Sequence, residues 1–147
     1  MCMSKEPAVF TDSELAYLGS QRLGRLATVS PSGAPQANPV GFTVNVELGT
    51  IDIFGFNLAK SKKYRNVRAN PKVAFVVDDL ASVNPWVVRG VEIRGVAEAL
   101  GGVAAPMAQM GDDVIRVHPR RIISWGVDAA SPGMSGRDVA DGTNEAA

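Results

Sequence analysis

A run of basic side chains between Asn57 and Lys72 is the part of this sequence best equipped for chemistry. Its cations are Lys60, Lys62, Lys63, Arg65, Arg68 and Lys72, and no Asp or Glu lies among them. The whole chain has a formal net charge of zero, so this positive charge is a local concentration. The chemical partner that such a strip would hold is a phosphate or a carboxylate.

Ser61 and Pro71 mark the two ends of a short helix inside this basic strip. We predict that Ser61 is the N-cap, which puts Lys62 and Lys63 in the first turn. Cations at a helix N-terminus oppose the helix dipole by roughly 0.3–1 kcal/mol each. They become favourable when an anion lies between them and the free N–H groups, and so the sequence predicts an anion site. The alternative is a solvated basic helix without a ligand.

Other catalytic groups are scarce in this sequence. Its one histidine, His118, and its one cysteine, Cys2, do not lie in a spacing typical of metal ligands, a catalytic triad or a disulfide framework. No apolar run reaches roughly 18 residues and no signal pattern opens the chain, so we expect a cytoplasmic protein that does not enter a membrane. Aromatic residues do not alternate with the basic ones, which disfavours nucleic acid as a partner. We therefore expect the chemistry to come from an organic cofactor and not from a metal.

The elements around the strip have the period of two that is typical of β-strands. With 147 residues and 46% hydrophobic content the chain can form one domain with a core. We expect a leader over residues 1–9, a helix that begins with a capping box at Thr11–Glu14, a domain over residues 10–127 and a polar, flexible tail over residues 128–147. The expected strands are Leu23–Ser30, Pro35–Val46, Thr50–Phe56, Val73–Val77, a long strand from Trp86 to Leu100, Val114–Val117 and Arg121–Val127. Hairpin spacing then predicts a mainly β fold, an antiparallel barrel of about six or seven strands with two short helices.

Pro39 and Gly41 interrupt the second expected strand. Proline cannot donate a hydrogen bond to a neighbouring strand, so Pro39 marks an edge, a bulge or backbone left free for a ligand. Gly41 leaves room for a flat group to approach the backbone. An ordinary bend of a barrel explains both residues equally well at this point.

Four segments in this order resemble the pyridoxamine 5′-phosphate oxidase-like flavin-binding split-barrel family, and within it the branch that depends on the deazaflavin coenzyme F420. The segments are SQRLGRLATV at 20–29, PVGF at 39–42, KKYRNV at 62–67 with NPKVAFVVDD after it, and HPRRIISWG at 118–126. The resemblance covers Phe10 to Val127. It implies a homodimer of split β-barrels with cofactor sites at the subunit interface.

The resemblance also implies where the cofactor lies. Lys63 would hold the phosphate, the strand through Pro39 would support the ring, and Trp86 would reach over from the second subunit. Many relatives carry an arginine two residues before the phosphate lysine, where this chain has Ser61, and Lys60 or Lys62 can supply that charge. The implied cofactor-binding residues are Ser61, Lys60, Lys62, Lys63, Asn66, Pro39, Val40, Gly41, Phe42, Phe56, Trp86 and Arg89. No residue stands out as a catalytic acid or base.

We therefore expect an F420-dependent oxidoreductase that transfers a hydride between the deazaflavin and a small-molecule substrate. The coenzyme carries a phosphodiester and a polyglutamate tail, and several weak contacts from a basic strip suit that tail. FMN has one terminal phosphate and would leave part of the strip unused. Two alternatives stay open: an FMN-dependent reductase or oxidase on the same barrel, and a protein that binds or stores F420 without turnover.

Overall fold

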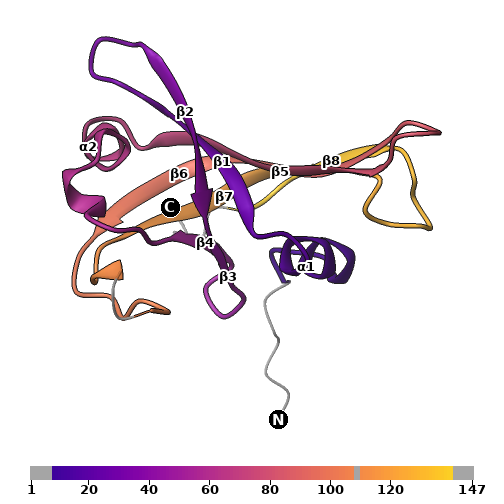
Figure 1. The fold of residues 1–147 in the computed structure, drawn as a ribbon, viewed down its shortest axis with the longest axis horizontal. Helices are drawn as coiled ribbons and strands as arrows, with labels where there is room; N and C mark the ends of the chain where they lie inside the picture. Colours follow the sequence, from indigo (N-terminus) through magenta and orange to yellow (C-terminus); the bar gives the residue numbers. More distant parts are fainter. Residues whose placement is uncertain (1–7, 108–109, 141–147) are drawn as a thin grey trace.

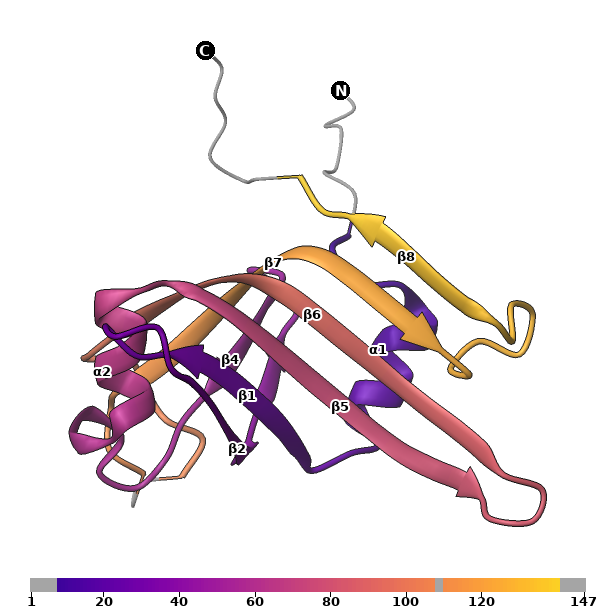
Figure 2. The same cartoon turned by 90° about the horizontal axis from the view of Figure 1, so that it is seen from above.

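The computed structural model describes residues 8–107 and 110–140 of the chain. Cys2, most of the expected leader and the end of the expected tail lie outside these residues. In the described part an antiparallel sheet curls around a hydrophobic core, with α2 at one end of the sheet and α1 packed near β3 and β6 (Figures 1 and 2). None of the described helices has the length and the apolar character needed to cross a membrane.

The described residues form eight strands in one sheet. The elements are α1 (Asp12–Gly19), β1 (Leu23–Val29), β2 (Pro35–Gly41), β3 (Thr43–Asn45), β4 (Thr50–Ile53), the 3₁₀ helix η1 (Leu58–Lys60), α2 (Lys62–Ala69), β5 (Lys72–Ser82), β6 (Val87–Leu100), β7 (Val114–Trp125) and β8 (Met134–Asp138). Neighbours follow the order β2-β1-β5-β6-β7-β4-β3, and β8 adds to β7. The expected mainly β split barrel with two short α-helices is confirmed, with one strand more than the sequence indicates.

The core lies on the concave side of this sheet. Burial alternates along β5 and β6, so that Phe75, Val77, Val91 and Ile93 are fully buried. Helix α1 begins with the predicted capping box, in which the hydroxyl of Thr11 accepts from the N–H of Glu14 at 3.1 Å. Buried side chains of both helices, Tyr17 and Leu18 of α1 and Tyr64 and Val67 of α2, belong to this core.

Strand β5 continues beyond Val77, where the sequence predicts that it ends. The two acidic residues that follow are held by arginines on neighbouring strands. Asp78 pairs with Arg25 at 3.1 Å, and Asp79 lies directly opposite Arg89 and pairs with it at 2.6 Å. Opposite charges across a strand pair stabilise the sheet, so the acidic residues extend the strand and do not end it.

Strand β7 is continuous through His118 and Pro119, where the sequence predicts two strands. Gly95 lies opposite Pro119 and Arg94 opposite Arg121, so Arg120 is the extra residue of a β-bulge. The bulge accommodates a proline without an N–H. A Cβ at Gly95 would collide with the carbonyl oxygen of His118, so glycine is required there.

Two other strand boundaries differ from the prediction. The second expected strand, Pro35–Val46, is divided at Phe42 into β2 and β3, which have different partners. The third, Thr50–Phe56, ends at Ile53, and the chain then turns toward η1. Both changes occur where the sheet splits between β2 and β4, a feature of topology that strand periodicity does not report.

The segment after Val127 is partly ordered, although its composition predicts a flexible tail. Strand β8 pairs with β7, and Arg137 on β8 reaches helix α1. The Arg137 guanidinium donates to both carboxylate oxygens of Glu14 at 2.7 and 2.8 Å and to the carbonyl oxygen of Val9 at 2.6 Å. Glu14 is only 2% exposed. This ion pair, whose carboxylate is buried, therefore fastens the segment to α1, together with the pairing of β8 with β7 and the packing of Val139 against the core.

Replacing Arg137 with alanine is expected to lower the free energy of unfolding by about 1–3 kcal/mol, because it leaves the buried carboxylate of Glu14 without its cation. Urea unfolding followed by circular dichroism measures the change. The matched control is Arg121→Ala, which removes the exposed Arg121–Asp138 pair between β7 and β8 and should cost less than about 1 kcal/mol. Equal small losses in both variants would contradict the prediction.

Candidate functional site

The start of helix α2 has the predicted form. Ser61 is the N-cap, and its hydroxyl accepts from the N–H of Tyr64 at 3.3 Å and donates to the carbonyl oxygen of Leu58 at 2.6 Å. Lys62 and Lys63 lie in the first turn, which contains no acidic residue. Free N–H groups and basic residues without an acidic neighbour are the features that suit an anion at a helix N-terminus.

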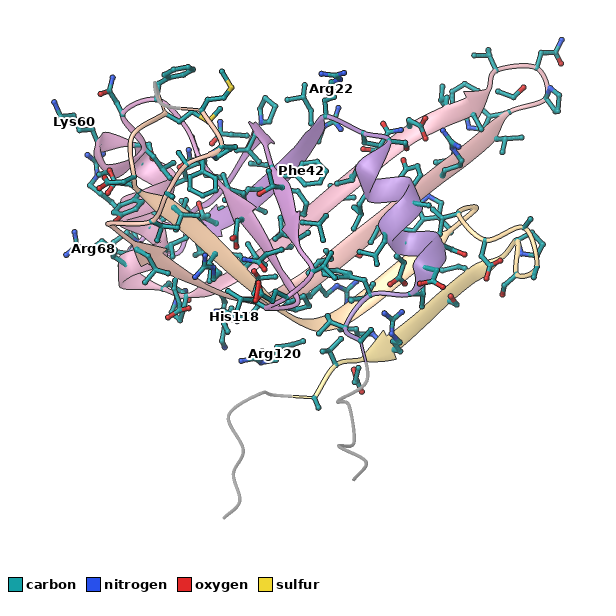
Figure 3. All side chains as sticks on the ribbon, turned by 90° about the horizontal axis from the view of Figure 1, so that it is seen from below. Arg22, Phe42, Lys60, Arg68, His118 and Arg120 are labelled. Atoms are coloured by element: carbon teal, nitrogen blue, oxygen red, sulfur yellow. The ribbon has the colours of Figure 1, made fainter. Side chains whose placement is uncertain are left out.

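The cations of the basic strip have no carboxylate partner among the described residues. They are Lys60, Lys62, Lys63, Arg65, Arg68 and Lys72. The arginines elsewhere that do pair with carboxylates are Arg25, Arg89, Arg94, Arg116, Arg121 and Arg137. Figure 3 shows Lys60 and Arg68 on the outer side of the α2 region, directed away from the core. The strip thus keeps its positive charge, which favours an anionic ligand.

Asn66 is a buried connector between α2 and the first hairpin. It is 2% exposed, and its amide donates to the hydroxyl of Thr28 at 3.0 Å and to the side-chain oxygen of Gln36 at 3.2 Å. Thr28 and Gln36 lie opposite each other on β1 and β2. Asn66 therefore positions the helix against β2. Its amide is turned to the interior and not to the surface.

The outer face of β2 is open at Gly41. Val40 is buried, and the ring of Phe42 packs edge-on against Phe75 with centroids 5.2 Å apart. Pro39 and Gly41 are exposed on an edge strand whose one neighbour is β1. A Cβ built at Gly41 meets no atom within 4 Å. A flat group can therefore lie on this face, while Val40 and Phe42 support it from the core side.

Trp86 and Arg89 are not gathered at α2 within one chain. Phe56 is 64% exposed in the turn before η1, and Trp86 is 65% exposed. Trp86 lies in the turn between β5 and β6, which Figure 2 shows at the opposite end of the sheet from α2. Only a second chain could bring that turn to the basic strip.

The guanidinium of Arg89 is held by Asp79. Two hydrogen bonds of 3.0 and 2.6 Å join them, and the guanidinium lies 5.2 Å from the ring centroid of Tyr17. The hydroxyl of Tyr17 donates to Asp79 at 2.9 Å. Arg89 holds the pKa of Asp79 below its usual range, while burial, followed by the contact with Asp79, raises the pKa of Tyr17. The cluster is internally neutralised and links α1 to the β5–β6 hairpin.

Two cavities that the sequence does not indicate lie beside the end of β2. The first, which we call the Phe42 cavity, has a volume of about 560 Å³. It is lined by Gly19, Ser20, Gln21, Arg22, Gly41, Phe42, Thr43, Phe54, Pro106, Met107 and Met110. The second, the Asp52 cavity, has a volume of about 540 Å³, shares Thr43, Phe54 and Pro106 with the first, and contains Asp52 and Arg116. Their walls come from four distant segments, so no local motif reports them.

Asp52 is a buried carboxylate at the wall of the second cavity. It is 4% exposed and accepts hydrogen bonds from Arg116 at 3.0 and 3.1 Å, from Asn45 at 3.1 Å and from Thr50 at 2.8 Å. Burial raises the pKa of Asp52, but these donors together outweigh it and hold the pKa below its usual range. All its acceptor capacity is used, which is the pattern of a structural ion pair.

His118 pairs with one carboxylate on the neighbouring strand. Its Nε2 lies 2.6 Å from Oε1 of Glu98. Among residues 8–107 and 110–140, no three His, Cys, Asp or Glu side chains lie close enough together to hold a metal ion.

Comparison with known proteins identifies the family to which this chain belongs. The family model for pyridoxamine 5′-phosphate oxidase matches residues 10–143. A 5a,11a-dehydrotetracycline/5a,11a-dehydrooxytetracycline reductase of Streptomyces rimosus is 46% identical over 132 residues, which cover 88% of this chain and 93% of that protein. A structure named F420 reductase is 31% identical with a TM-score of 0.51, covering 69% of this chain and 88% of that one.

A further solved structure shows the same fold over almost the full length. The conserved hypothetical protein Rv2991 of Mycobacterium tuberculosis is 26% identical with a TM-score of 0.63, and the match covers 97% of this chain and 100% of that one. The family model covers residues 10–143, which include the split sheet and the helix between β4 and β5. This chain belongs to the pyridoxamine 5′-phosphate oxidase family.

Proposed function

We propose that this chain is an oxidoreductase that binds a deazaflavin of the F420 type and reduces a carbon–carbon double bond in a polycyclic small molecule. The observation that carries the proposal is the unneutralised basic strip at the start of α2, tied through Asn66 to a β2 strand whose outer face is open at Gly41. The family, the dehydrotetracycline reductase and the F420 reductase structure support an oxidoreductase.

The residues present fit such a cofactor. The N–H groups of the first turn of α2, with Lys62 and Lys63, suit a phosphodiester. Asn66 contacts Gln36 on β2, and Gly41 lies five residues further along that strand, roughly 16 Å away at about 3.3 Å per residue. An extended cofactor can therefore span both. The outer cations Lys60 and Arg68 suit further acidic groups beyond the phosphate.

The reduced deazaflavin, when bound, supplies a hydride, and a proton from solvent completes reduction of the double bond. The chain itself holds and orients the two reactants. Lys63 and Lys62 fix the anionic part, the face of β2 over Pro39 and Gly41 fixes the plane of the ring, and Phe42 keeps that strand in place through Phe75. Alignment of the reacting atoms, and not a titrating side chain, is the contribution we assign to the protein.

We also propose that the protein works as a homodimer. The end of the β5–β6 hairpin, its turn and the adjoining strand residues, exposes a group of large apolar side chains, which are Leu80, Val83, Trp86, Val87 and Val88. Exposed apolar patches of this kind mark interaction sites. A second copy that covers the turn would also bring Trp86 to the cofactor of its partner.

Parallel titrations with coenzyme F420 and with FMN, followed by quenching of tryptophan fluorescence, test the proposed function. We expect F420 to bind more tightly than FMN, in a species of twice the chain mass. Lys63→Ala should weaken F420 binding about tenfold, because it removes a charge-assisted hydrogen bond. Lys72→Ala, at the other end of the strip, is the matched control and should change binding less than about threefold.

The other outcomes separate the alternatives. Tighter binding of FMN would move the assignment to a flavin-dependent reductase or oxidase. Tight F420 binding without reduction of any unsaturated polycyclic substrate would favour a binding or storage protein. Binding of neither cofactor would contradict the proposal and leave the basic strip as a solvated helix.

A further inference from the structure

The Phe42 cavity has the size and lining of a site for a small organic molecule. Its volume of about 560 Å³ falls within the roughly 300–1,000 Å³ of typical ligand pockets. Phe42, Phe54, Met107 and Met110 give it an apolar wall, and Gln21 and Arg22 are polar groups at its rim. An apolar wall with a few polar groups is the arrangement that binds a ligand and also orients it.

The apolar wall suits a flat, polycyclic ligand. Phe42 is fixed by its edge-on contact with Phe75, so it offers a rigid aromatic surface. The two methionine side chains are flexible and polarisable, and thioether–aromatic contacts are favourable. Met107 is 49% exposed at the mouth of the cavity, where a bound ring system would cover it.

Arg22 is a cation at the rim with no hydrogen-bond or ion-pair partner among the described residues. It lies between α1 and β1, and Figure 3 shows it on the same side of the molecule as Phe42. Arg25, three residues further along, pairs with Asp78 at 3.1 Å. A guanidinium left unneutralised beside an apolar cavity favours a ligand that carries an anionic oxygen.

The cavity lies next to the proposed cofactor face. Gly41 lines the cavity and also belongs to the open outer face of β2. A molecule in the cavity therefore borders a ring that lies on β2. Hydride transfer requires the reacting atoms to approach within about 3–3.5 Å, and this shared boundary allows that approach.

We propose that the Phe42 cavity is the substrate pocket, that it takes a flat polycyclic compound bearing a carboxylate, phenolate or enolate, and that Arg22 determines specificity by pairing with that group. The assignment to substrate rests on the proposed function. The binding preference itself does not, because it follows from the cavity and from Arg22 alone, and so the two can be tested separately.

The test uses two fluorescent probes with the same ring system and the full chain without cofactor. The first is 8-anilinonaphthalene-1-sulfonate, which is anionic, and the second is N-phenyl-1-naphthylamine, which lacks the sulfonate. We expect Arg22→Ala to raise the Kd of the anionic probe about fivefold to tenfold and to leave that of the neutral probe unchanged. Arg22→Lys should restore part of the difference, and the control Arg25→Ala should alter neither probe.

A second variant locates both probes in the cavity. Met110→Asp places a carboxylate in the apolar wall and should weaken both, since each would have to desolvate that charge. Unchanged binding of both probes to Met110→Asp would show that they bind elsewhere and would overturn the proposal. An unchanged Kd of the anionic probe for Arg22→Ala would also overturn it. F420 binding to Arg22→Ala should match that of the unmodified chain. If F420 fails to bind while the probe discrimination persists, the proposed function fails and the pocket stands.

Discussion

Replacing Arg116 with alanine is expected to lower the free energy of unfolding by about 3–5 kcal/mol, because it leaves a buried carboxylate without its cation. The side chain of Asp52 is 6% exposed and that of Arg116 16% exposed. Asn45 and Thr50 still donate to Asp52 in the variant, but neither carries charge. Urea unfolding at pH 7 measures the loss, and Arg25→Ala, which removes an exposed pair, should cost less than about 1 kcal/mol.

The loss of stability in Arg116→Ala should also depend on pH. The pKa of Asp52 in the folded chain is lower than its ordinary value of 3.8. The ion pair therefore contributes fully above that ordinary value, and its contribution disappears as the pH falls through the lower pKa of the folded state. The gap in stability between the unmodified chain and the variant should accordingly be widest at neutral pH and should narrow in acid.

Two observations would contradict this interpretation of Asp52. One is a gap that stays constant from pH 7 to about pH 3, since the carboxylate charge is what makes the variant unstable. The other is a failure of the double variant Asp52→Asn with Arg116→Met to recover stability. That pair removes both charges at similar volume, and replacing a buried ion pair in this way is often neutral.

The parts of the fold that follow from neighbouring residues could be predicted from the sequence. Thr11 and Glu14 form their capping box within one turn, and Ser61 caps α2 through the N–H of Tyr64 three residues away. The basic strip is likewise local, because all its cations come from one short segment. Its position at a helix N-terminus followed from the position of Ser61 alone.

The parts that depend on distant partners could not be predicted. Asp52 and Arg116 are 64 residues apart, and Glu14 and Arg137 are 123 apart. Without knowledge of strand order, the carboxylate of Asp52 has no visible reason to be buried. The same holds for the segment around Arg137, where polar composition predicts flexibility but a long-range ion pair anchors a strand.

In the candidate site, too, the local features could be predicted and the features that depend on distant residues could not. Lys62 and Lys63 lie where the sequence predicts, whereas the amide of Asn66 is used in the interior and the guanidinium of Arg89 is held by Asp79. A side chain's sequence position shows that it is near the site but not which way it points. The Phe42 cavity, assembled from four segments, is visible only after the strands are placed.

Gly41→Phe is expected to weaken F420 binding about a hundredfold or more while the domain stays folded. An added Cβ at Gly41 meets no protein atom within 4 Å, so the phenyl ring would extend into the space that we assign to the cofactor ring. Forcing a side chain into an occupied contact costs about 1–3 kcal/mol or more. Because phenylalanine favours strands more than glycine does, the free energy of unfolding should change by less than about 1 kcal/mol.

The matched control for Gly41→Phe is Gly133→Phe, in the turn before β8, where an added Cβ also meets no atom within 4 Å. This variant should bind F420 like the unmodified chain, because it adds the same side chain far from β2. Titration of both variants by fluorescence quenching, with urea unfolding of each, separates blocked binding from loss of the fold. Full F420 binding by a folded Gly41→Phe variant would exclude the outer face of β2 as the binding site of the deazaflavin ring, because the added phenyl ring would occupy that face. The basic strip would then have to direct the cofactor along another surface of the sheet.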